Sequence, residues 1–285
     1  MQAAIANLAF YQFTHLSEPL AFRDALRSFV KQNCPTMRGT VLVSHEGINV
    51  FVAAPDDEAE TFLAYLDKEP AFRDLLVKRS RSEAIPYSRM LIKLKKEIIP
   101  LGLPEVEPHR LTGDRLKPEE LAQWIDEKKD FILLDTRNQY EVDVGTFKGA
   151  KSLRIRHFRH FPKELDQYGS VGDAREKPVV MFCTGGIRCE KATAYALQSG
   201  WKNVYQLDGG ILNYFDRMGS KHYNGECFVF DQRVAVDGNL KEATTLQCFA
   251  CRAPLTIEEQ KDSKYIAGVS CPKCESFKAG DKRTV

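Results

Sequence analysis

The fold of this chain is decided by the stretch Val179-Val180-Met181-Phe182-Cys183-Thr184-Gly185-Gly186-Ile187-Arg188-Cys189-Glu190-Lys191. Its first four residues are apolar and predict a buried strand, and the apolar residues from Ala192 to Leu197 follow at spacings typical of a helix. Gly185 and Gly186 let the loop between these elements curl with its backbone N–H groups pointing inward. Cys183 therefore precedes a helix N-terminus, where a thiol pKa falls from about 8.5 toward or below neutrality and the thiolate becomes a nucleophile.

The alternative for Cys183 is a buried structural thiol, since free cysteines are often buried. The spacing Cys-x4-Arg from Cys183 to Arg188 favours the nucleophile, because it closes a loop one residue shorter than the Cys-x5-Arg phosphate cradle of tyrosine phosphatases, and a shorter ring suits sulfur. We expect Arg188 to hold an anionic substrate or to orient the thiolate by its charge. Cys189 either resolves an oxidised Cys183 or lies buried in the helix, and we favour the structural role.

Three further motifs accompany the loop. They are Leu133-Leu134-Asp135-Thr136-Arg137, the segment from Tyr140-Glu141 through Gly145 to Phe147-Lys148-Gly149-Ala150, and Leu207-Asp208-Gly209-Gly210. Together they resemble the rhodanese family, whose six-residue active loop carries a cysteine persulfide held by backbone N–H groups. The resemblance implies that Cys183 and Arg188 are catalytic and that Thr184, Gly185, Gly186 and Ile187 form the active loop. Asp135 and Arg137 are the expected supporting residues, with Arg137 paired to a carboxylate.

The whole chain has an ordinary globular composition. It has 285 residues, of which 43% are hydrophobic and 28% charged, which leaves room for two or three domains. No span approaches transmembrane length, and the first ten residues lack the basic start and cleavage site of a secretory signal, so we expect no membrane association. Eight cysteines, several in Cys-x2-Cys pairs, favour a reducing compartment with metal-binding and catalytic thiols, and the expected location is the cytoplasm.

Positive charge gathers in two stretches, although the formal net charge is only +2. The first stretch, Lys78 to Glu97, contains Arg89, Lys93, Lys95 and Lys96, and the second, Lys151 to Lys163, contains Arg154, Arg156 and Arg159 and no acid. Each is either a solvated surface or the footprint of a nucleic-acid site. Two such stretches beside a nucleophile favour contacts with RNA phosphates, and we expect both to face the same side as Cys183.

Residues 1 to 104 are predicted to form a ferredoxin-like (acylphosphatase-like) α+β domain, which ends in a linker spaced by prolines. The expected order is strand, helix, two strands, helix, two strands. Strands are expected at Ile5–Phe13, Thr40–Ser44, Ile48–Ala53 and Met90–Ile99, and helices at Ala21–Lys31 and Asp57–Leu66. His45 and Glu46 lie at the hairpin turn, where we expect local hydrogen bonds rather than acid/base catalysis.

Residues 105 to 222 are predicted to form a rhodanese-like domain with a doubly wound parallel sheet. A helix is expected at Pro118–Glu127, and buried strands at Ile132–Leu134, Val179–Phe182 and Val204–Leu207. Asp135, Cys183 and Asp208 each follow an apolar run, so they should meet at the carboxyl edge of the sheet, where ligands bind in open α/β folds. Phe158 or Phe161, within the second basic stretch, is a candidate for stacking on an RNA base, and we expect at least one of them to pack under the loop instead.

Residues 223 to 285 are rich in cysteine. Cys248 and Cys251 form one Cys-x2-Cys pair, and nineteen residues separate it from a second pair, Cys271 and Cys274. Each pair can clasp one side of a tetrahedral ion, which predicts a small zinc-ribbon-like region with structural zinc rather than four unmetallated thiols. The metal would supply much of the folding energy of this region. Cys227 has no assigned role.

From Phe10 to about Cys274 the chain is similar to the oxygen-dependent tRNA uridine hydroxylases. The motifs that carry the likeness are Glu46-Gly47-Ile48-Asn49, Lys95-Lys96-Glu97-Ile98-Ile99, Asp135-Thr136-Arg137-Asn138, Gly145-Thr146-Phe147-Lys148-Gly149-Ala150, Phe158-Arg159-His160-Phe161-Pro162 and the stretch from Cys183 to Lys191. Common rhodaneses have a histidine where this chain has Thr146. Val50-Phe51 departs from the small residues that the family carries after Asn49.

The resemblance implies an oxidoreductase that hydroxylates C5 of the wobble uridine in the tRNA anticodon loop, with molecular oxygen as co-substrate. Cys183 would act as a thiolate or persulfide that adds to C6 of the base or carries the oxidising equivalent. The sequence has neither a dinucleotide-binding glycine fingerprint nor an iron-type set of histidines and carboxylates, so flavin, nicotinamide and non-haem iron are not indicated. Two alternatives stay open: a rhodanese-type sulfurtransferase that uses the same loop, and a non-catalytic zinc-ribbon RNA-binding protein in which Cys183 is unreactive.

Overall fold

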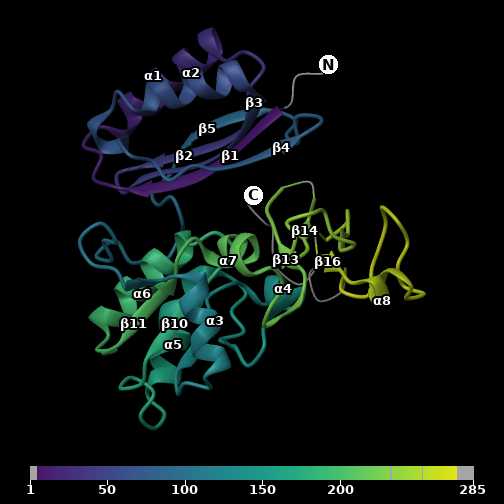
Figure 1. Ribbon diagram of the computed structural model, residues 1–285. Helices are drawn as coiled ribbons and strands as arrows, with labels where there is room; N and C mark the ends of the chain where they lie inside the picture. Colours follow the sequence, from purple (N-terminus) through teal and green to yellow (C-terminus); the bar gives the residue numbers. More distant parts are fainter. Residues whose placement is uncertain (1–4, 232, 252, 275–285) are drawn as a thin grey trace. The chain divides into compact units, whose positions relative to one another are not determined.

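Two units make up the chain in the computed structural model, Met1–Leu111 and Thr112–Val285 (Figure 1). The structure describes residues 5–231, 233–251 and 253–274, so residues 275–285 of the predicted C-terminal region lie outside the described residues. Within the described ranges, no helix is both long and apolar enough to cross a membrane.

The N-terminal unit is an α+β sandwich with the predicted order of elements. Its elements are β1 (Ile5–Phe13), α1 (Pro19–Asn33), β2 (Arg38–Ser44), β3 (Gly47–Pro55), α2 (Asp56–Leu66), the short 3-10 helix η1 (Pro70–Phe72), β4 (Lys78–Ser82) and β5 (Met90–Leu94). The strand order is β4-β1-β3-β2-β5, with β5 parallel to β2 and the other pairs antiparallel. Both helices lie on the same face of this sheet (Figure 1).

Alternation along the central strands builds the core of this unit. Leu8 and Phe10 of β1 and Val50 and Val52 of β3 are buried in one cluster with residues of both helices, including Phe62. Because successive strand side chains point to opposite faces, the residues between them lie on the face away from the helices. The predicted ferredoxin-like fold is confirmed.

The last strand is shorter than predicted, because β5 ends at Leu94 and not at Ile99. Ile98 leaves the sheet ladder, and both of its backbone groups bond to side chains from the β2–β3 hairpin instead. Its N–H donates to Glu46 Oε1 at 2.7 Å, and its carbonyl accepts from Asn49 Nδ2 at 3.3 Å. The motifs Glu46-Gly47-Ile48-Asn49 and Lys95-Lys96-Glu97-Ile98-Ile99 therefore form one structural clamp. Glu46 makes a local hydrogen bond in it, as expected.

The central part of the second unit is an α/β layered fold built on a parallel sheet. Its elements are β6 (Asp114–Leu116), α3 (Pro118–Asp126), β7 (Ile132–Asp135), α4 (Gln139–Val142), β8 (Gly145–Phe147), β9 (Lys151–Ser152), the 3-10 helix η2 (Phe158–His160), α5 (Phe161–Gly169), β10 (Val179–Phe182), α6 (Ile187–Gln198), β11 (Val204–Leu207) and α7 (Gly210–Met218). The sheet order is β6-β11-β10-β7-β9, and every neighbouring pair is parallel. The predicted rhodanese-like fold is confirmed.

Both faces of this sheet are covered, which explains why β10 is apolar throughout. Val180 and Phe182 share a core cluster with residues of α3 and α7, whereas the intervening Val179 and Met181 are equally buried on the other face. All carboxyl ends of the parallel strands reach the same edge, and Cys183 leaves the central strand β10 there.

The cysteine-rich region forms short antiparallel pairs rather than a further large sheet. Its elements are β12 (Tyr223–Gly225), β13 (Cys227–Phe228), β14 (Ala235–Val236), β15 (Leu246–Gln247), β16 (Pro254–Leu255) and α8 (Ile257–Gln260). Strand β12 pairs with β8, and Tyr223 packs edge-on against Phe147 and donates a hydrogen bond to the Gly145 carbonyl at 2.7 Å. This region therefore packs on the rhodanese-like fold as part of the same unit.

Candidate active site and metal centre

Cys183 lies where the buried strand β10 meets the N-terminus of α6, as the sequence predicts. Gly186 adopts a left-handed conformation with φ of 102° just before the helix, and its N–H donates to Cys183 Sγ at 3.1 Å. Thr184, Gly185 and Gly186 form the bend after Cys183, and Ile187 is the first residue of α6. The backbone of this loop thus points a donor at Cys183, whose side chain is fully buried.

The N-terminus of α7 binds the active loop through two backbone hydrogen bonds. The N–H groups of Ile211 and Leu212 donate to the carbonyls of Cys183 and Thr184 at 2.9 and 3.1 Å. Gly210 has a φ of 68°, and an added Cβ would lie only 2.5 Å from the Cys183 carbonyl oxygen. The Gly209-Gly210 pair quoted from the sequence is therefore needed for close contact with the loop.

The electrostatic environment stabilises a thiolate. Burial favours the neutral thiol, but the Cys189 thiol, the charge of Arg188 and the backbone N–H groups of Arg188 and Gly186 outweigh it and lower the pKa of Cys183 to about 5. Burial and the hydrogen bond to Cys183 raise the pKa of Cys189. At neutral pH Cys183 is therefore ionised, and Cys189 is a neutral donor to it.

Arg188 is anchored by a residue that the sequence analysis did not assign to the site. Its Nη1 and Nη2 donate to the two carboxylate oxygens of Glu141 at 2.6 and 2.8 Å, and both side chains are buried. Glu141 also caps α4 by accepting from the Asn138 N–H at 3.1 Å. Glu141 takes one N–H of each terminal nitrogen and fixes the guanidinium, whose charge lowers the pKa of Cys183. The expected role of Arg188 as an anion clamp stays a prediction. The capping pattern Asn138-x-x-Glu141 was the available signal for Glu141.

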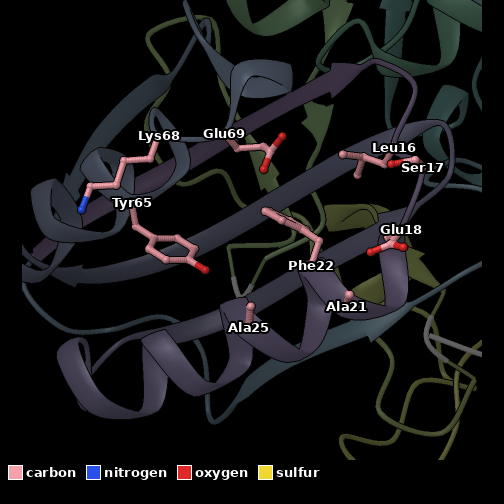
Figure 2. Close-up of a pocket in the computed structure, with 9 residues that line it drawn as sticks. All are labelled: Leu16, Ser17, Glu18, Ala21, Phe22, Ala25, Tyr65, Lys68 and Glu69. Carbon is pink, nitrogen blue, oxygen red and sulfur yellow. The ribbon is translucent and has the colours of Figure 1, made fainter.

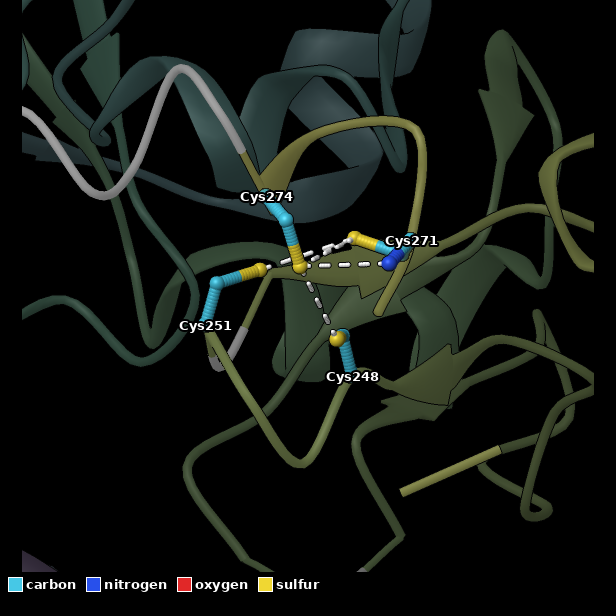
Figure 3. Close-up of side chains that lie close together, drawn as sticks. All are labelled: Cys248, Cys251, Cys271 and Cys274. Atoms are coloured by element: carbon cyan, nitrogen blue, oxygen red, sulfur yellow. Dashed lines mark hydrogen bonds between the residues drawn. The ribbon is translucent and has the colours of Figure 1, made fainter. Parts of the chain in front are cut away.

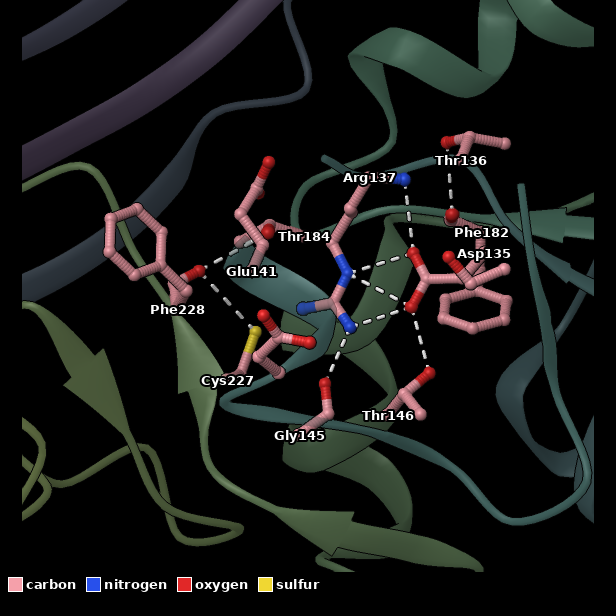
Figure 4. Close-up of polar contacts among 12 residues, drawn as sticks. Asp135, Thr136, Arg137, Glu141, Gly145, Thr146, Phe182, Thr184, Cys227 and Phe228 are labelled. Carbon is pink, nitrogen blue, oxygen red and sulfur yellow. Dashed lines mark hydrogen bonds and ion pairs between the residues drawn. The ribbon is translucent and has the colours of Figure 1, made fainter. Parts of the chain in front are cut away.

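Asp135 and Arg137 form a second buried ion pair at the end of β7 (Figure 4). Arg137 Nη2 donates to Asp135 Oδ2 at 2.7 Å and to the Gly145 carbonyl at 2.6 Å. Thr146, which stands where common rhodaneses have histidine, donates to the same carboxylate at 2.8 Å. The predicted pairing of Arg137 with a carboxylate is present, and this network fixes the turn that leads to β8.

The second basic stretch leaves the sheet at the same edge as Cys183. Ser152, at the end of β9, pairs with Asp135, and Asp135 pairs with Phe182, the residue before Cys183. Arg154, Arg156 and Arg159 follow and are exposed. Phe158 and Phe161, by contrast, are both buried, as expected for at least one of them, and neither ring is exposed for stacking on a base. Their rings pack on each other with centroids 5.6 Å apart, because this segment turns inward to start α5.

Arg89, Lys93, Lys95 and Lys96 of the first basic stretch lie in the N-terminal unit, with Lys93 on β5 and the other three outside it. Lys93 is half-buried, and Arg89, Lys95 and Lys96 are exposed. That these residues share a side with Cys183 stays a prediction.

The two Cys-x2-Cys pairs come together as expected (Figure 3). The sulfur atoms of Cys248, Cys251, Cys271 and Cys274 all lie within 4.8 Å of one another. Sγ–Sγ distances are 3.9 Å for Cys248–Cys274, 3.5 Å for Cys251–Cys271 and 3.7 Å for Cys271–Cys274. A tetrahedral ion with metal–sulfur bonds of about 2.3 Å needs sulfur separations of about 3.8 Å. The cluster can therefore hold a metal ion, and its geometry is compatible with zinc.

A cavity of about 450 Å³ lies on the helical side of the N-terminal unit (Figure 2). Residues before and within α1 and at the end of α2 line it, among them Phe22, Tyr65, Glu18, Glu69 and Lys68. The lining contains two carboxylates, of Glu18 and Glu69, and one ammonium group, of Lys68, and this charge balance disfavours a polyanion such as RNA. We place no part of the active site in this cavity.

The two remaining cysteines, Cys227 and Cys34, differ from Cys183 in the pKa of their thiols. Cys227 is fully buried, and its burial raises the pKa of its thiol to about 12. Cys34, in the N-terminal unit, is also buried, and burial raises its pKa to about 11. Both are neutral core thiols at physiological pH.

Two family models match separate parts of the chain. The family model for the UPF0176 acylphosphatase like domain matches residues 5–98, and that for the rhodanese-like domain matches residues 117–216. The tRNA uridine(34) hydroxylase of Cupriavidus metallidurans is 42% identical over 277 residues, which cover 95% of this chain and 96% of that protein. The protein of the same name from Paraburkholderia xenovorans is 43% identical over 282 residues, with the same coverage.

Solved structures of low sequence identity resemble part of the chain. A rhodanese-like domain from Anabaena is 16% identical with a TM-score of 0.34, covering 40% of this chain and 80% of that chain. A thiosulfate sulfurtransferase from Pseudomonas aeruginosa is 20% identical with a TM-score of 0.36, covering 42% of this chain and 22% of that chain.

The cysteine cluster generates a first prediction. Replacing one ligand, Cys251→Ser, is expected to remove one equivalent of bound divalent metal, because a hydroxyl is a poor substitute for a thiolate ligand. The matched control Cys34→Ser, a buried cysteine outside the cluster, should keep the full equivalent. Elemental analysis of both purified proteins checks this, and equal metal content would contradict it.

Proposed function

The chain belongs to the tRNA uridine(34) hydroxylase family, and from this premise we propose that it hydroxylates C5 of uridine 34 in tRNA with Cys183 as the nucleophile. One observation carries the role of Cys183: a fully buried thiol whose pKa is nevertheless lowered to about 5 at the carboxyl edge of a parallel sheet. A buried structural thiol has no need of such stabilisation, and Cys34 and Cys227 have raised pKa values. Strongly perturbed groups of this kind mark reactive sites.

The chemistry starts from the electron-poor C6 of the pyrimidine ring. The sulfur of Cys183 adds to C6, and the C5=C6 electron pair moves onto the C4 carbonyl, so that C5 becomes nucleophilic toward oxygen. One oxygen atom of O₂ stays on C5. The second leaves as water with two protons and two electrons, which we assign to a thiol reductant. Loss of the C5 proton and departure of the sulfur restore the double bond.

The burial of Cys183 favours its persulfide as the reacting form. The Cys183 thiolate would take a sulfane sulfur from a persulfide or thiosulfate donor, which leaves as a thiolate or as sulfite, and the outer sulfur would then be the atom that adds to C6. Its Sγ has no exposed surface, whereas the outer sulfur of a persulfide extends the reacting atom by one S–S bond of about 2.05 Å. The same N–H donors and the Arg188 charge that favour the thiolate also suit an anionic persulfide. Arg188, oriented by Glu141, and the backbone of Gly186 thus stabilise negative charge on sulfur when it departs from C6.

We assign structural zinc to the four-cysteine cluster. The sulfur separations support tetrahedral coordination, and the Cys271 N–H donates to Cys274 Sγ at 3.1 Å, which stabilises a thiolate ligand. Bound zinc would supply folding energy to a region with few apolar residues, and we give it no part in the reaction.

Phosphates of the anticodon arm are assigned to Arg154, Arg156 and Arg159. These exposed residues follow β9 at the sheet edge from which Cys183 emerges. Clustered arginines neutralise phosphates without reading sequence, so they would position the loop while the unpaired base enters the active site.

A sulfurtransferase is the second candidate, because the persulfide-binding loop and the match to the rhodanese-like domain model serve that reaction equally well. A thiosulfate-to-cyanide assay run beside mass spectrometry of tRNA nucleosides separates the two activities. The non-catalytic alternative fits poorly, because it offers no reason for a thiolate at Cys183.

The central prediction concerns the nucleophile. In cells that depend on this protein, Cys183→Ser should abolish 5-hydroxyuridine at position 34, because serine has a far higher pKa and cannot carry a persulfide. Cys34→Ser is the control and should leave the modification intact. Nucleoside mass spectrometry measures both, and modification at the wild-type level in Cys183→Ser would refute the proposal.

A further prediction concerns the phosphate contacts. Charge reversal of Arg154, Arg156 and Arg159 to glutamate should weaken tRNA binding and reduce the slope of log K against log salt by about 2, since each lost phosphate contact removes about 0.7 to 0.9 from it. The double variant Lys128→Glu with Lys202→Glu places reversed charges before β7 and β11, at the opposite edge of the sheet, and is expected to change binding much less. Equal effects in the two variants would show that only net charge matters.

A further inference from the structure

The N-terminal sheet carries an aromatic residue in an unusual place. Phe51 lies in the middle of the central strand β3, yet 39% of it is exposed, because it points away from the face that α1 and α2 cover. Its neighbours Val50 and Val52 point the other way and belong to the buried core. An exposed ring at the centre of a sheet, rather than at its rim, calls for an explanation in terms of function.

The strand register places small and polar residues beside this ring. Phe51 pairs with Ala9 on β1 and with Thr40 on β2, so neither immediate neighbour on this face is large. Tyr11 pairs with Asn49 and is therefore a diagonal neighbour of Phe51 on the same face. Tyr11 on β1 and Phe51 on β3 thus lie diagonally on neighbouring strands of one sheet face, and the third aromatic residue of this face, Phe13 at the end of β1, is buried.

The charge on this face is of one sign. The strand positions that alternate with the core are Ile5, Asn7, Ala9, Tyr11, Phe13, Arg38, Thr40, Leu42, Ser44, Gly47, Asn49, Phe51, Ala53, Pro55, Lys78, Ser80, Ser82, Leu91 and Lys93, and none of these described residues has a carboxylate side chain. The helical side is different: Arg79 pairs with Glu60 and Arg81 pairs with Asp56. The face that carries Phe51 is therefore basic and polar, and it is complementary to a polyanion.

We propose that this sheet face binds unpaired nucleotides of RNA, with one base stacked on the Phe51 ring and the neighbouring phosphate near Lys93. The proposal rests on the proposed function, since tRNA supplies the RNA, and it adds a substrate-binding surface to the N-terminal unit. Aromatic residues on the two central strands of an open sheet are how RNA-recognition modules stack two or three bases. Stacking tolerates any base, whereas basic residues beside it hold the backbone.

RNA fits this face better than an apolar partner does. Thr40 lies directly beside the ring and Asn7 diagonally to it, and Lys93 carries a positive charge two strands away on β5. The apolar residues of this face other than Phe51 are half-buried or buried. A protein partner would bury these polar groups at a cost, whereas a nucleotide offers a flat base for the ring and oxygen atoms for its neighbours.

The test compares Phe51→Ala with Leu94→Ala in the full chain. Leu94 is 40% exposed on the same sheet, but it follows the alternation of the core residue Ile92 and so lies on the helical side. The probe is an anticodon stem-loop RNA with 2-aminopurine in its loop, titrated by fluorescence. Phe51→Ala should raise Kd about tenfold or more and remove part of the quenching that stacking causes, while the salt slope stays unchanged because no charge is lost. Phe51→Trp, which keeps an aromatic ring at this position, should bind the probe as tightly as the wild type, and so should Leu94→Ala.

Equal Kd values for Phe51→Ala and Leu94→Ala would overturn the proposal. So would an equal loss of affinity for a fully paired, two-strand RNA duplex, because the ring can stack only on unpaired bases. These outcomes are independent of the nucleophile: Cys183→Ser should bind the probe normally and fail only in hydroxylation, so the failure of one proposal leaves the other testable.

Discussion

A negative charge on a buried sulfur is the constraint on which the rest of the active unit depends. Burial alone would keep Cys183 neutral, and only the donors of the loop, the Cys189 thiol and the Arg188 charge lower its pKa to about 5. Because this folded-state pKa lies below the value of about 8.5 for an unfolded cysteine, ionisation stabilises the fold fully above about pH 8.5. That contribution is lost as the pH falls through about 5.

The surrounding elements stabilise this charge indirectly, by holding the groups that contact the sulfur. Glu141 holds the Arg188 guanidinium, and α7 binds the loop carbonyls so that the loop N–H groups stay turned toward the sulfur. Two carboxylate–arginine pairs are buried in one small region, and leaving either partner alone would cost about 3–5 kcal/mol. This arrangement explains why the motifs around Asp135, Glu141 and Gly210 occur together in one sequence.

Local sequence pattern predicted much of this architecture. The strands at Val179–Phe182 and Val204–Leu207 have the expected bounds, because continuous apolar runs between turn residues leave few alternatives. The four-cysteine cluster could also be predicted, because the spacing of the two Cys-x2-Cys pairs is typical of a metal site. Contacts between side chains that are distant in the sequence could not be predicted, because neither the Glu141–Arg188 pair nor the clamp on Ile98 follows from periodicity. The burial of Phe158 and Phe161 and the exposure of Phe51 depend on which face each element presents, and composition does not show that.

Titration of Cys183 through its thiolate ultraviolet absorbance, taken as the difference between wild type and Cys183→Ser, tests this account most directly. The account predicts a midpoint near about 5 in the wild type. It predicts a clear upward shift in Gly210→Ala, whose Cβ would displace the active loop, and no shift in Gly172→Ala, which has a similar φ of 59° but open space around the added Cβ. A midpoint near that of an ordinary thiol in the wild type, or an unchanged midpoint in Gly210→Ala, would contradict it.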